Sequence, residues 1–346
     1  MNKVHFEEHE EAIQRGIQFI YRTACDAENF ATYGSDYLCC FSLIASTSRG
    51  LKLRRLAREM GRERARQWRK EHPSLPRQPS ASTIEKFIEG TVSSDKLGVR
   101  DGALKECIQH AAARFTAQDI LGFDPAVEPP PADIPQECRC GAVNARGRKT
   151  CRDCKRRLSM QSRYQTWMKA LYGGYLSERS RVRFGTRYAD ALAWLPDVRP
   201  YCAPHEGSND DFYYSVYAIT HLVYTLNDYG RYQLSPRWLP CEFEFLKANL
   251  EEAIAIDDPD MVGEFMDSLK AFGLANNGPM VRRGTQYLLS VQNSDGSWGD
   301  PNEDDCERFH STWTAVDGLR DFAWRGQKLS FPNLKPLLQS WARDRR

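Results

Sequence analysis

The chain lacks any apolar run close to the roughly 20 residues that a membrane-spanning helix needs, and it lacks a large net charge. Its 48 Lys and Arg residues are balanced by 46 Asp and Glu residues among 346 in all. This balance argues against a protein that coats nucleic acid or an acidic membrane surface, because both need a strong positive field. Residues 1–16 are acidic and contain no apolar signal core. We therefore expect a cytoplasmic globular protein without a transmembrane segment.

Several familiar catalytic motifs are also missing. The sequence has no Walker A loop, no dinucleotide-binding GxGxxG, no HExxH and no context for a Ser-His-Asp triad. Nucleotide-driven and serine-hydrolase chemistry are therefore poorly supported. Of the 11 cysteines, four cluster at metal-ligand spacing and the others are scattered, which is typical of a reducing compartment more than of a disulfide framework.

Strand-like alternation is almost absent, and helical periodicity runs through most of the chain. Apolar residues recur three and four apart in segments from 9–24 to 309–324. The pattern predicts an all-α fold of about ten to twelve helices. Residues 49–79 carry a basic run that ends in a proline-spaced loop, predicted as a solvated helix face, with an anionic partner surface as the alternative. Pro-rich residues 125–135 read as a stiff linker, so we expect a helical part over 1–124, a linker and cysteine module over 125–158, and a second helical part over 159–346.

An internal repeat joins the two ends of the chain. Residues 15–30 read RGIQFIYRTACDAENF, and residues 283–298 read RGTQYLLSVQNSDGSW. The Arg-Gly pair, the Gln, the apolar triplet and the final aromatic residue match at a constant offset without gaps. Each copy precedes another apolar helix, which predicts a helix, a tight turn and a helix at both ends of the chain.

The second copy resembles the QW repeat of α/α-toroid proteins, namely squalene–hopene-type terpene cyclases and protein prenyltransferase β subunits. Gln292 and Trp298 would be the Gln and Trp of the repeat, with Gly296 in the turn. We expect the Gln amide to satisfy free backbone groups at a helix end while the Trp ties one helix terminus to the next. The following FHSTWTAVDGL resembles the prenyltransferase segment whose zinc-binding His would be His310.

The resemblance implies an α/α toroid, a barrel of paired inner and outer helices, that acts on an isoprenoid or polyene-like substrate in a central cavity. The reaction would be acid-assisted cyclisation or group transfer. The sequence departs from the family in its acidic motifs: it has no DxDD, only the adjacent pair Asp210 and Asp211, and no DDxxD. The prenyltransferase Asp-x-Cys is also absent upstream of His310. The fold is therefore predicted more directly than the chemistry.

Residues 138–154, CRCGAVNARGRKTCRDC, form the strongest motif. Two short knuckles bring Cys138, Cys140, Cys151 and Cys154 together, which suits a closed tetrahedral structural Zn²⁺ site. The segment resembles a RanBP2-type zinc finger with a shortened first knuckle. The simple interpretation is a structural staple; the alternative is a module that binds RNA or a protein with the help of nearby basic residues, namely residues 54–70 and Arg146, Arg148, Lys149, Arg152, Lys155, Arg156 and Arg157.

Candidate catalytic residues come from three helices. In the helix near 210–229, Asp210, Tyr214, Tyr217, His221, Tyr224 and Asp228 share one face, opposite an apolar stripe. Such groups transfer protons, stabilise cations or bind metal, whereas a solvated face usually carries Lys and Glu. His310 and Asp317 lie two turns apart on one face of the helix after the QW-like turn. Asp36 begins the corresponding helix of the first copy.

Weaker candidates are the loop pair His205–Glu206 and the acids Asp190 and Glu264 on otherwise apolar helices. Three functions remain open at this stage. The first is the acid-driven enzyme, with Asp or His as the acid and aromatic faces stabilising positive charge. The second is an enzyme with a second, catalytic Zn or non-haem Fe held by His221, His310 and nearby carboxylates. The third is a zinc-finger protein that binds RNA or a protein.

Overall fold

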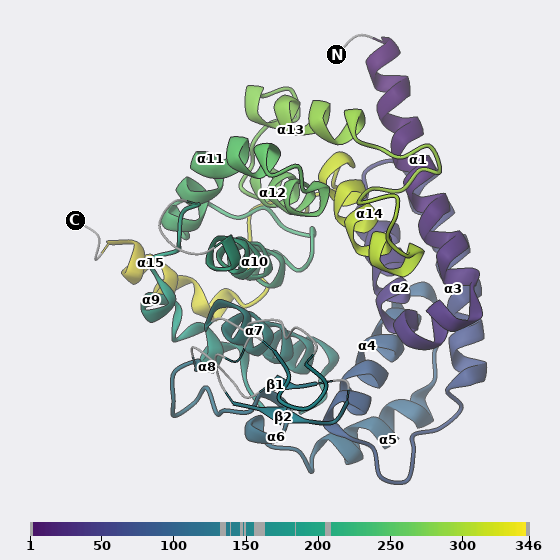
Figure 1. Ribbon diagram of the computed structural model, residues 1–346, viewed down its shortest axis with the longest axis vertical. Coiled ribbons are helices and arrows are strands. Elements are labelled where there is room, and N and C mark those ends of the chain that lie inside the picture. Colours follow the sequence, from purple (N-terminus) through teal and green to yellow (C-terminus); the bar gives the residue numbers. More distant parts are fainter. Residues whose placement is uncertain are drawn as a thin grey trace. The chain divides into compact units, whose positions relative to one another are not determined.

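The computed structural model describes residues 3–131, 136–138, 140–145, 148, 150–155, 163–183, 185–204 and 209–343. These residues are mostly helical, as predicted, with one two-stranded sheet among them (Figure 1). Fifteen α-helices are present in the described ranges, more than the ten to twelve expected. The excess comes from short helices of four or five residues, such as α6, α8 and α9, which are too short for periodicity to reveal. Within the described residues, no helix combines the length and apolarity that crossing a bilayer requires.

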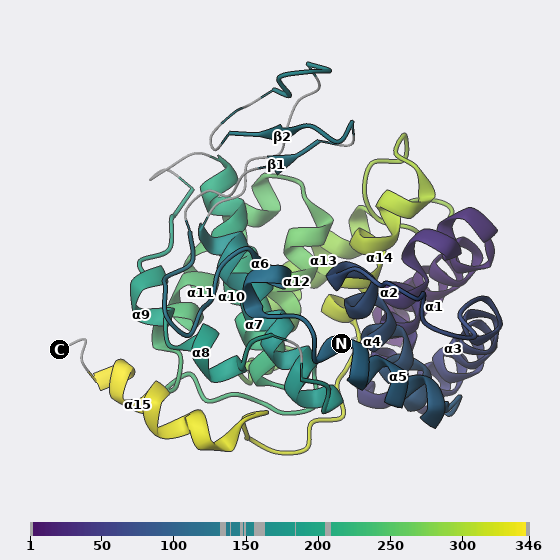
Figure 2. The same ribbon diagram turned by 90° about the horizontal axis from the view of Figure 1, so that it is seen from below.

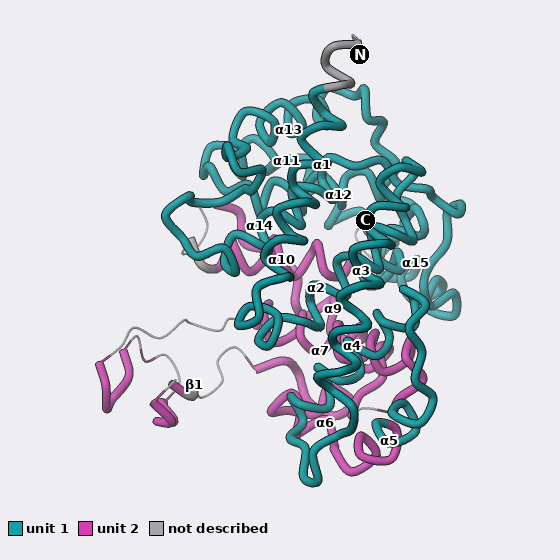
Figure 3. The backbone as a smooth tube through the Cα atoms, turned by 90° about the vertical axis from the view of Figure 1, so that its right-hand side faces the viewer, with its two compact units in different colours: residues 1–108, 223–346 teal, residues 109–222 magenta. Residues whose placement is uncertain are grey.

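The chain divides into two compact units, which Figure 3 colours separately. Unit 1 comprises residues 1–108 and 223–346, and unit 2 comprises residues 109–222. The longer helices of unit 1 are α1 (Lys3–Cys25), α2 (Ala27–Thr47), α3 (Leu51–Glu71), α4 (Ala81–Leu97), α11 (Pro240–Ala255), α12 (Pro259–Ala271), α13 (Pro279–Ser290), α14 (Asp305–Leu319) and, after the short 3-10 helix η1 (Pro332–Leu334), α15 (Lys335–Arg343). Two helices continue from one unit into the other: α5 (Gly102–Ala112) and α10 (Asn209–Leu226).

Unit 1 has an inner and an outer layer of helices. In the inner layer, α4 packs on α2, α2 on α14, and α14 on α12. The outer helices α3, α1, α13 and α11 each pack against one or two of these inner helices (Figures 1 and 2). Burial agrees with this division: α12 is buried on all sides, from Asp260 to Ala271, whereas α13 buries only Val281, Gly284, Tyr287 and Leu288.

The QW-like turn ties α13 to α1. The side-chain amide of Gln292 donates to the backbone oxygens of Ala12, at 2.9 Å, and Gly296, at 3.0 Å. The indole of Trp298, which is fully buried, donates to the carbonyl of Leu288 at 2.7 Å in the last turn of α13. Gly296 has a φ of +92°, and a Cβ there would lie 2.8 Å from the Arg15 carbonyl oxygen. Trp298 therefore bonds a helix terminus as expected, whereas the Gln292 amide reaches the middle of α1 and not a helix end.

Two predicted helix boundaries are wrong. The helix expected over 309–324 ends at Leu319, because Phe322 leaves it to pair with Ser48 in an isolated antiparallel bridge. The helix expected from Tyr33 begins at Ala27, because Asp26 caps it by accepting from two backbone N–H groups, and Tyr33 marks only a kink. The two repeat copies thus differ: residues 27–30 are helical, whereas their counterparts 295–298 form a turn.

Unit 2 contains the cysteine module and several helices. Strands β1 (Gln136–Glu137) and β2 (Val143–Asn144) pair antiparallel, as Figure 2 shows. Helix α6 (Ala117–Leu121) precedes them, and α7 (Arg163–Ser180), α8 (Tyr188–Leu192), α9 (Leu195–Val198) and most of α10 follow. This division rests on contacts within the fold, and the domain boundaries expected from the sequence stay a prediction.

Candidate functional site

Helices α12 and α14 bring the candidate site together in unit 1. Asp258 caps α12 by accepting from the N–H groups of Asp260 and Met261, and Pro259 occupies the first turn, where its missing N–H costs nothing. Asp260 and Glu264 then lie one turn apart on α12. On α14, His310 faces the same region, so that two acids from one helix meet an imidazole from its neighbour.

The ligand atoms of Asp260, Glu264 and His310 all lie within 4.8 Å of one another. Nδ1 of His310 donates to Oδ1 of Asp260 at 3.0 Å, and Oγ1 of Thr314 donates to the same oxygen at 2.8 Å. Both carboxylate residues are buried, whereas 49% of the His310 side chain is exposed. The imidazole is therefore the accessible member of a cluster whose acids are shielded from solvent.

The charges of this cluster shift several pKa values. The charge of Asp260 raises the pKa of His310 to about 9, against an opposing effect of burial; Glu264 and Asp36 add to the rise. His310 is thus an imidazolium at neutral pH. Burial raises the pKa of Asp36 on α2, while the positive charge of His310 acts to lower it. Asp36 therefore belongs electrostatically to the same cluster, and its carboxyl is harder to ionise than an exposed one.

Asp317 lies deeper, toward the far end of α14. Its carboxylate accepts from Nε of Arg320 at 2.5 Å, and the side chain of Arg320 is almost fully buried. Asp267 of α12 lies nearby, and burial, together with the charge of Asp317, raises its pKa to about 8. Oδ1 of Asp267 accepts no hydrogen bond from any described residue. Asp317, predicted as a catalytic candidate, therefore stands in an ion pair with Arg320.

Helix α10 carries the predicted aromatic residues, but it ends at Leu226, so Asp228 lies beyond it with a φ of +57° and pairs with Arg231 at 3.0 Å. The opposing stripe of Phe212, Val216, Ile219, Val223 and Leu226 is buried. On the other face, Tyr213 and Tyr217 have ring centroids 4.4 Å apart, and Tyr217 and His221 have theirs 6.1 Å apart. Nδ1 of His221 donates to the Tyr217 carbonyl at 2.9 Å. Tyr213 and Tyr214 stand edge to face.

His221, Tyr214 and Tyr217 belong to unit 2, and His310, Asp36 and Asp317 to unit 1. Because the two groups belong to different units, their convergence stays a prediction. Among the weaker candidates, Glu264 joins the His310 cluster, whereas Asp190 pairs with the exposed Arg187 at 2.6 Å. His205, Glu206 and the side chain of Asp210 lie outside the described residues.

The four predicted zinc ligands converge in unit 2. The Sγ atoms of Cys138, Cys140, Cys151 and Cys154 all lie within 4.8 Å of one another, as a four-thiolate metal site requires. Backbone N–H groups, first that of Cys154, lower the pKa of the Cys151 thiol to about 6, which favours the thiolate that binds metal. Of the neighbouring basic residues, Arg146, Lys149, Arg156 and Arg157 lie outside the described residues.

Asn144 stabilises this cysteine cluster through its side-chain hydrogen bonds. Its carbonyl oxygen accepts from the N–H of Arg152 at 2.8 Å, and its amide donates to the Ala142 carbonyl at 2.9 Å and to Sγ of Cys151 at 3.7 Å. The side chain is buried, so the amide joins the two knuckles where water is excluded. Hydrogen bonds of this kind orient metal ligands from outside the coordination sphere.

Asp260 is the residue of the main cluster that the sequence reading missed. Residues 257–260 lack the spacing of a DDxxD motif. The informative signal was instead the pair Asp260 and Glu264, two acids at i and i+4 among the apolar residues of the first two turns of α12.

Comparison with known proteins gives no relative. No protein-family model, no curated protein and no solved structure matches this chain.

Proposed function

We propose that the protein is an enzyme whose active centre consists of Asp36, Asp260, Glu264 and His310, and that it acts on a small hydrophobic substrate of isoprenoid or polyene type. The observation that carries the proposal is the meeting of His310 with Asp260 and Glu264 within 4.8 Å, with a third acid, the half-buried Asp36, close enough for its charge to act on His310. Buried carboxylates are costly, and clusters of them around one accessible imidazole are characteristic of catalytic sites.

In this proposal Asp36 is the general acid. Burial raises the pKa of its carboxyl, which favours the protonated acid, and the neighbouring His310 imidazolium stabilises the carboxylate that remains after proton transfer. The proton adds to a carbon of a substrate double bond, whose electron pair forms the new C–H bond and leaves a carbocation. The ring of Trp313, 6.2 Å from that of His310, supplies a face that stabilises positive charge. Loss of a proton from the final cation restores the Asp36 carboxyl.

The finer fold belongs to the same proposal. We propose an α/α toroid in which α4, α2, α14 and α12 are inner helices and α3, α1, α13 and α11 are outer helices. Three observations support it: the two layers of unit 1, the contact of the QW-like turn with α1, and the position of Asp36, Asp260, Glu264 and His310 on inner helices only.

The test is product formation from a panel of linear isoprenoids, namely squalene, oxidosqualene and farnesyl diphosphate, followed by mass spectrometry and chromatography. Asp36→Asn and His310→Ala should each lower the rate by about 10²- to 10⁴-fold, the range expected for loss of a general acid or its stabilising partner. Asp190→Asn is the matched control, because its carboxylate pairs with an exposed arginine. Equal rates in Asp36→Asn and the wild type would refute the assignment of the acid.

A metal-dependent enzyme is the second candidate, favoured by the donor set itself. One imidazole and two carboxylates at this spacing match the ligands of Zn, Mn or non-haem Fe sites. Bound there, the ion would supply Lewis-acid or redox chemistry, and Asp260, Glu264 and His310 would hold it. Metal analysis of the purified chain separates the two candidates. A second metal that His310→Ala removes supports the metal enzyme, and one zinc per chain that persists in His310→Ala supports the acid mechanism.

For the cysteine cluster we propose a structural Zn²⁺ held by Cys138, Cys140, Cys151 and Cys154. The four converging sulfur atoms and the hydrogen bonds of Asn144 support a closed site without an open coordination position. Binding of RNA or a protein through this module is the alternative role. A cytoplasmic location is part of the same proposal.

A further inference from the structure

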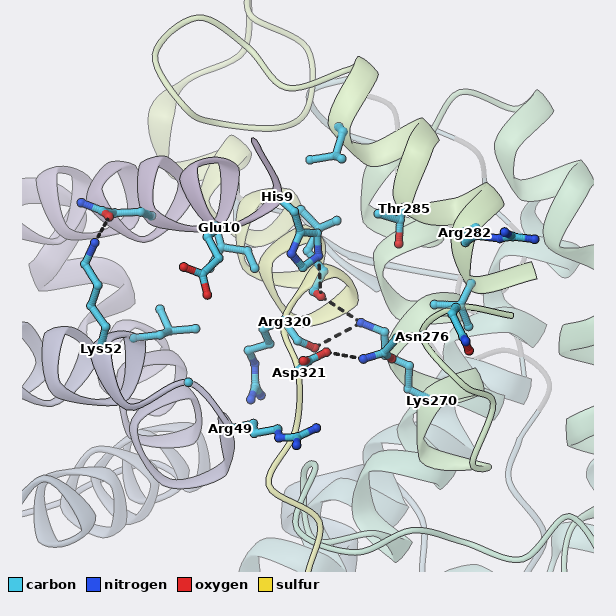
Figure 4. A pocket seen from close by; sticks show the side chains of 18 of the residues that line it. His9, Glu10, Arg49, Lys52, Lys270, Asn276, Arg282, Thr285, Arg320 and Asp321 are labelled. Atoms are coloured by element: carbon cyan, nitrogen blue, oxygen red, sulfur yellow. Dashed lines mark hydrogen bonds between the residues drawn. The ribbon is translucent and has the colours of Figure 1, made fainter. Parts of the chain in front are cut away.

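A hollow of unit 1 lies away from the proposed active centre. It has a volume of about 730 Å³ and is bordered by α1, the start of α3, α13 and the end of α14 (Figure 4). This volume is in the range of sites for small organic ligands. Asp260 lies in the first turn of α12 and Lys270, which lines the hollow, in its last turn. Ten residues of helix separate them, which corresponds to about 15 Å along the axis.

The floor of the hollow is a built polar structure. The ammonium group of Lys270, only 4% exposed, donates to the carbonyls of Gly318 at 2.5 Å, Leu319 at 3.0 Å and Arg320 at 3.1 Å at the end of α14. Nε2 of His9 donates to the Leu319 carbonyl at 3.0 Å. Burial lowers the pKa of His9. The carbonyls of Gly318, Leu319 and Arg320 are therefore already engaged by groups of the protein.

The walls are mainly aliphatic and the rim is cationic. Ile13, Leu53, Leu56, Val281 and Leu289 line the interior. Arg49, Lys52 and Arg282 also border the hollow, and Figure 4 shows their side chains apart from one another. The guanidinium groups of Arg49 and Arg282 have no hydrogen bond or ion pair within the described residues. Lys52 donates only to the neutral Gln14, at 3.0 Å.

The negative charge at this hollow is largely engaged already. Asp321 accepts from the side-chain amide of Asn276 and lies in the field of Lys270. Arg320 is neutralised by Asp317. The lining charges that remain are three positive ones, on Arg49, Lys52 and Arg282, and one negative one, on Glu10. The balance attracts an anion to the rim of an apolar cavity.

The backbone of Arg49 is held in place by hydrogen bonds. Its N–H donates to the Asp321 carbonyl at 2.7 Å, and Ser48 beside it pairs with Phe322. Arg49, Lys270, Asn276 and Asp321 also line an adjoining hollow of about 210 Å³ that contains Trp324. Arg49 thus stands where the two hollows meet.

We infer that this hollow binds an amphipathic anion, with an aliphatic chain between α1, α3 and α13 and a carboxylate or phosphate head at the cationic rim. Such a ligand satisfies the aliphatic walls and the unopposed cations at once. The inference goes beyond the proposed function, because no residue of this hollow belongs to the proposed active centre.

The test is isothermal titration calorimetry of the full chain with dodecyl phosphate below its micelle concentration. Inorganic phosphate and dodecanol are the head-only and tail-only comparisons, and dodecanoate reports which head group is preferred. We expect one dodecyl phosphate or dodecanoate per chain, bound more tightly than either fragment. No heat from either anion, or equal affinity for dodecanol, would overturn the inference.

Variants locate the site. Arg49→Glu and Arg282→Glu should each weaken binding about tenfold or more, as expected when a charge-assisted contact is lost. Thr285→Trp should abolish binding by filling the hollow, with its thermal melting curve showing that it is folded. Arg283→Glu is the matched control, because it makes the same charge change one residue further along α13. The wild-type Arg283 pairs with Glu251 and does not line the hollow. Equal weakening by Arg283→Glu would show a nonspecific charge effect and refute the site.

His310→Ala separates this inference from the proposed function. It should bind dodecyl phosphate as the wild type does, even where product formation is lost. An absence of product in the isoprenoid assay would therefore refute the proposed function but not the anion site. An absence of binding in the titration would refute the anion site but not the proposed function.

Discussion

Gly263 of α12 and Gly318 of α14 lie in direct backbone contact. A Cβ at Gly318 would be 2.9 Å from the Cα of Gly263, and a Cβ at Gly263 would be 2.5 Å from the Thr314 carbonyl oxygen. No side chain separates the two helices here. This close approach lets Asp260 and Glu264 reach His310, and it lets Lys270 reach the last carbonyls of α14.

Gly263→Ala should therefore destabilise the protein. The added methyl group meets backbone atoms, which cannot move aside as a flexible side chain does, so we expect a loss of about 1–3 kcal/mol in the free energy of unfolding. Urea denaturation followed by circular dichroism measures it. Gly102→Ala is the control, because a Cβ there has no neighbour within 4 Å. A Gly263→Ala protein as stable as the control would contradict the backbone contact.

The sequence was sufficient for the helices and the cysteine cluster because both depend on local spacing. The periodicity over 260–273 predicted α12 almost to its ends, and the spacing of Cys138, Cys140, Cys151 and Cys154 predicted their convergence. His310 was found through its place after the QW-like turn.

What the sequence could not supply was the pairing of residues far apart in the chain. Asp260 and His310 are separated by 50 positions, and only the contact of α12 with α14 brings them together. The same holds for the end of α14. The apolar pattern continues to Trp324, but the pairing of Phe322 with Ser48, more than 270 residues away, competes successfully with another helical turn.

Gln292→Ala should weaken the contact between the QW-like turn and α1. The substitution leaves the carbonyls of Ala12 and Gly296 without their amide donor, which costs about 1–3 kcal/mol where the groups are shielded from water. Thermal and urea denaturation measure the change. Gln78→Ala, in an exposed loop, should have no effect. An unaltered Gln292→Ala protein would remove the physical basis of the QW comparison.

Cys151→Ser should remove the structural metal. We expect one zinc per wild-type chain and none in the variant, because three thiolates and a hydroxyl bind zinc far more weakly than four thiolates. Metal analysis gives the stoichiometry, and limited proteolysis between residues 131 and 163 reports local unfolding. Cys107→Ser, an exposed cysteine outside the cluster, is the matched control. Equal zinc content in both variants would exclude the site.

Asp260→Asn should return the pKa of His310 from about 9 toward its ordinary value of 6.5, since Asp260 is the main cause of the rise. A pKa raised on folding adds stability that is complete below about pH 6.5 and is lost as pH rises through about 9. Because the imidazole is half-exposed, solvent screening limits this contribution to about 1 kcal/mol.

The measurement is the free energy of unfolding at pH 6.5 and pH 10 in both proteins, with the His310 ring titrated by NMR. Lys270 and Asp267, each with a pKa of about 8, titrate in the same window, but they do so in both proteins and cancel in the difference. Wild-type stability should therefore fall more between the two pH values than that of Asp260→Asn, by about 1 kcal/mol. His310→Gln, which cannot titrate, should reproduce the flatter profile. A ring that still titrates near pH 9 in Asp260→Asn would show that another group holds the proton.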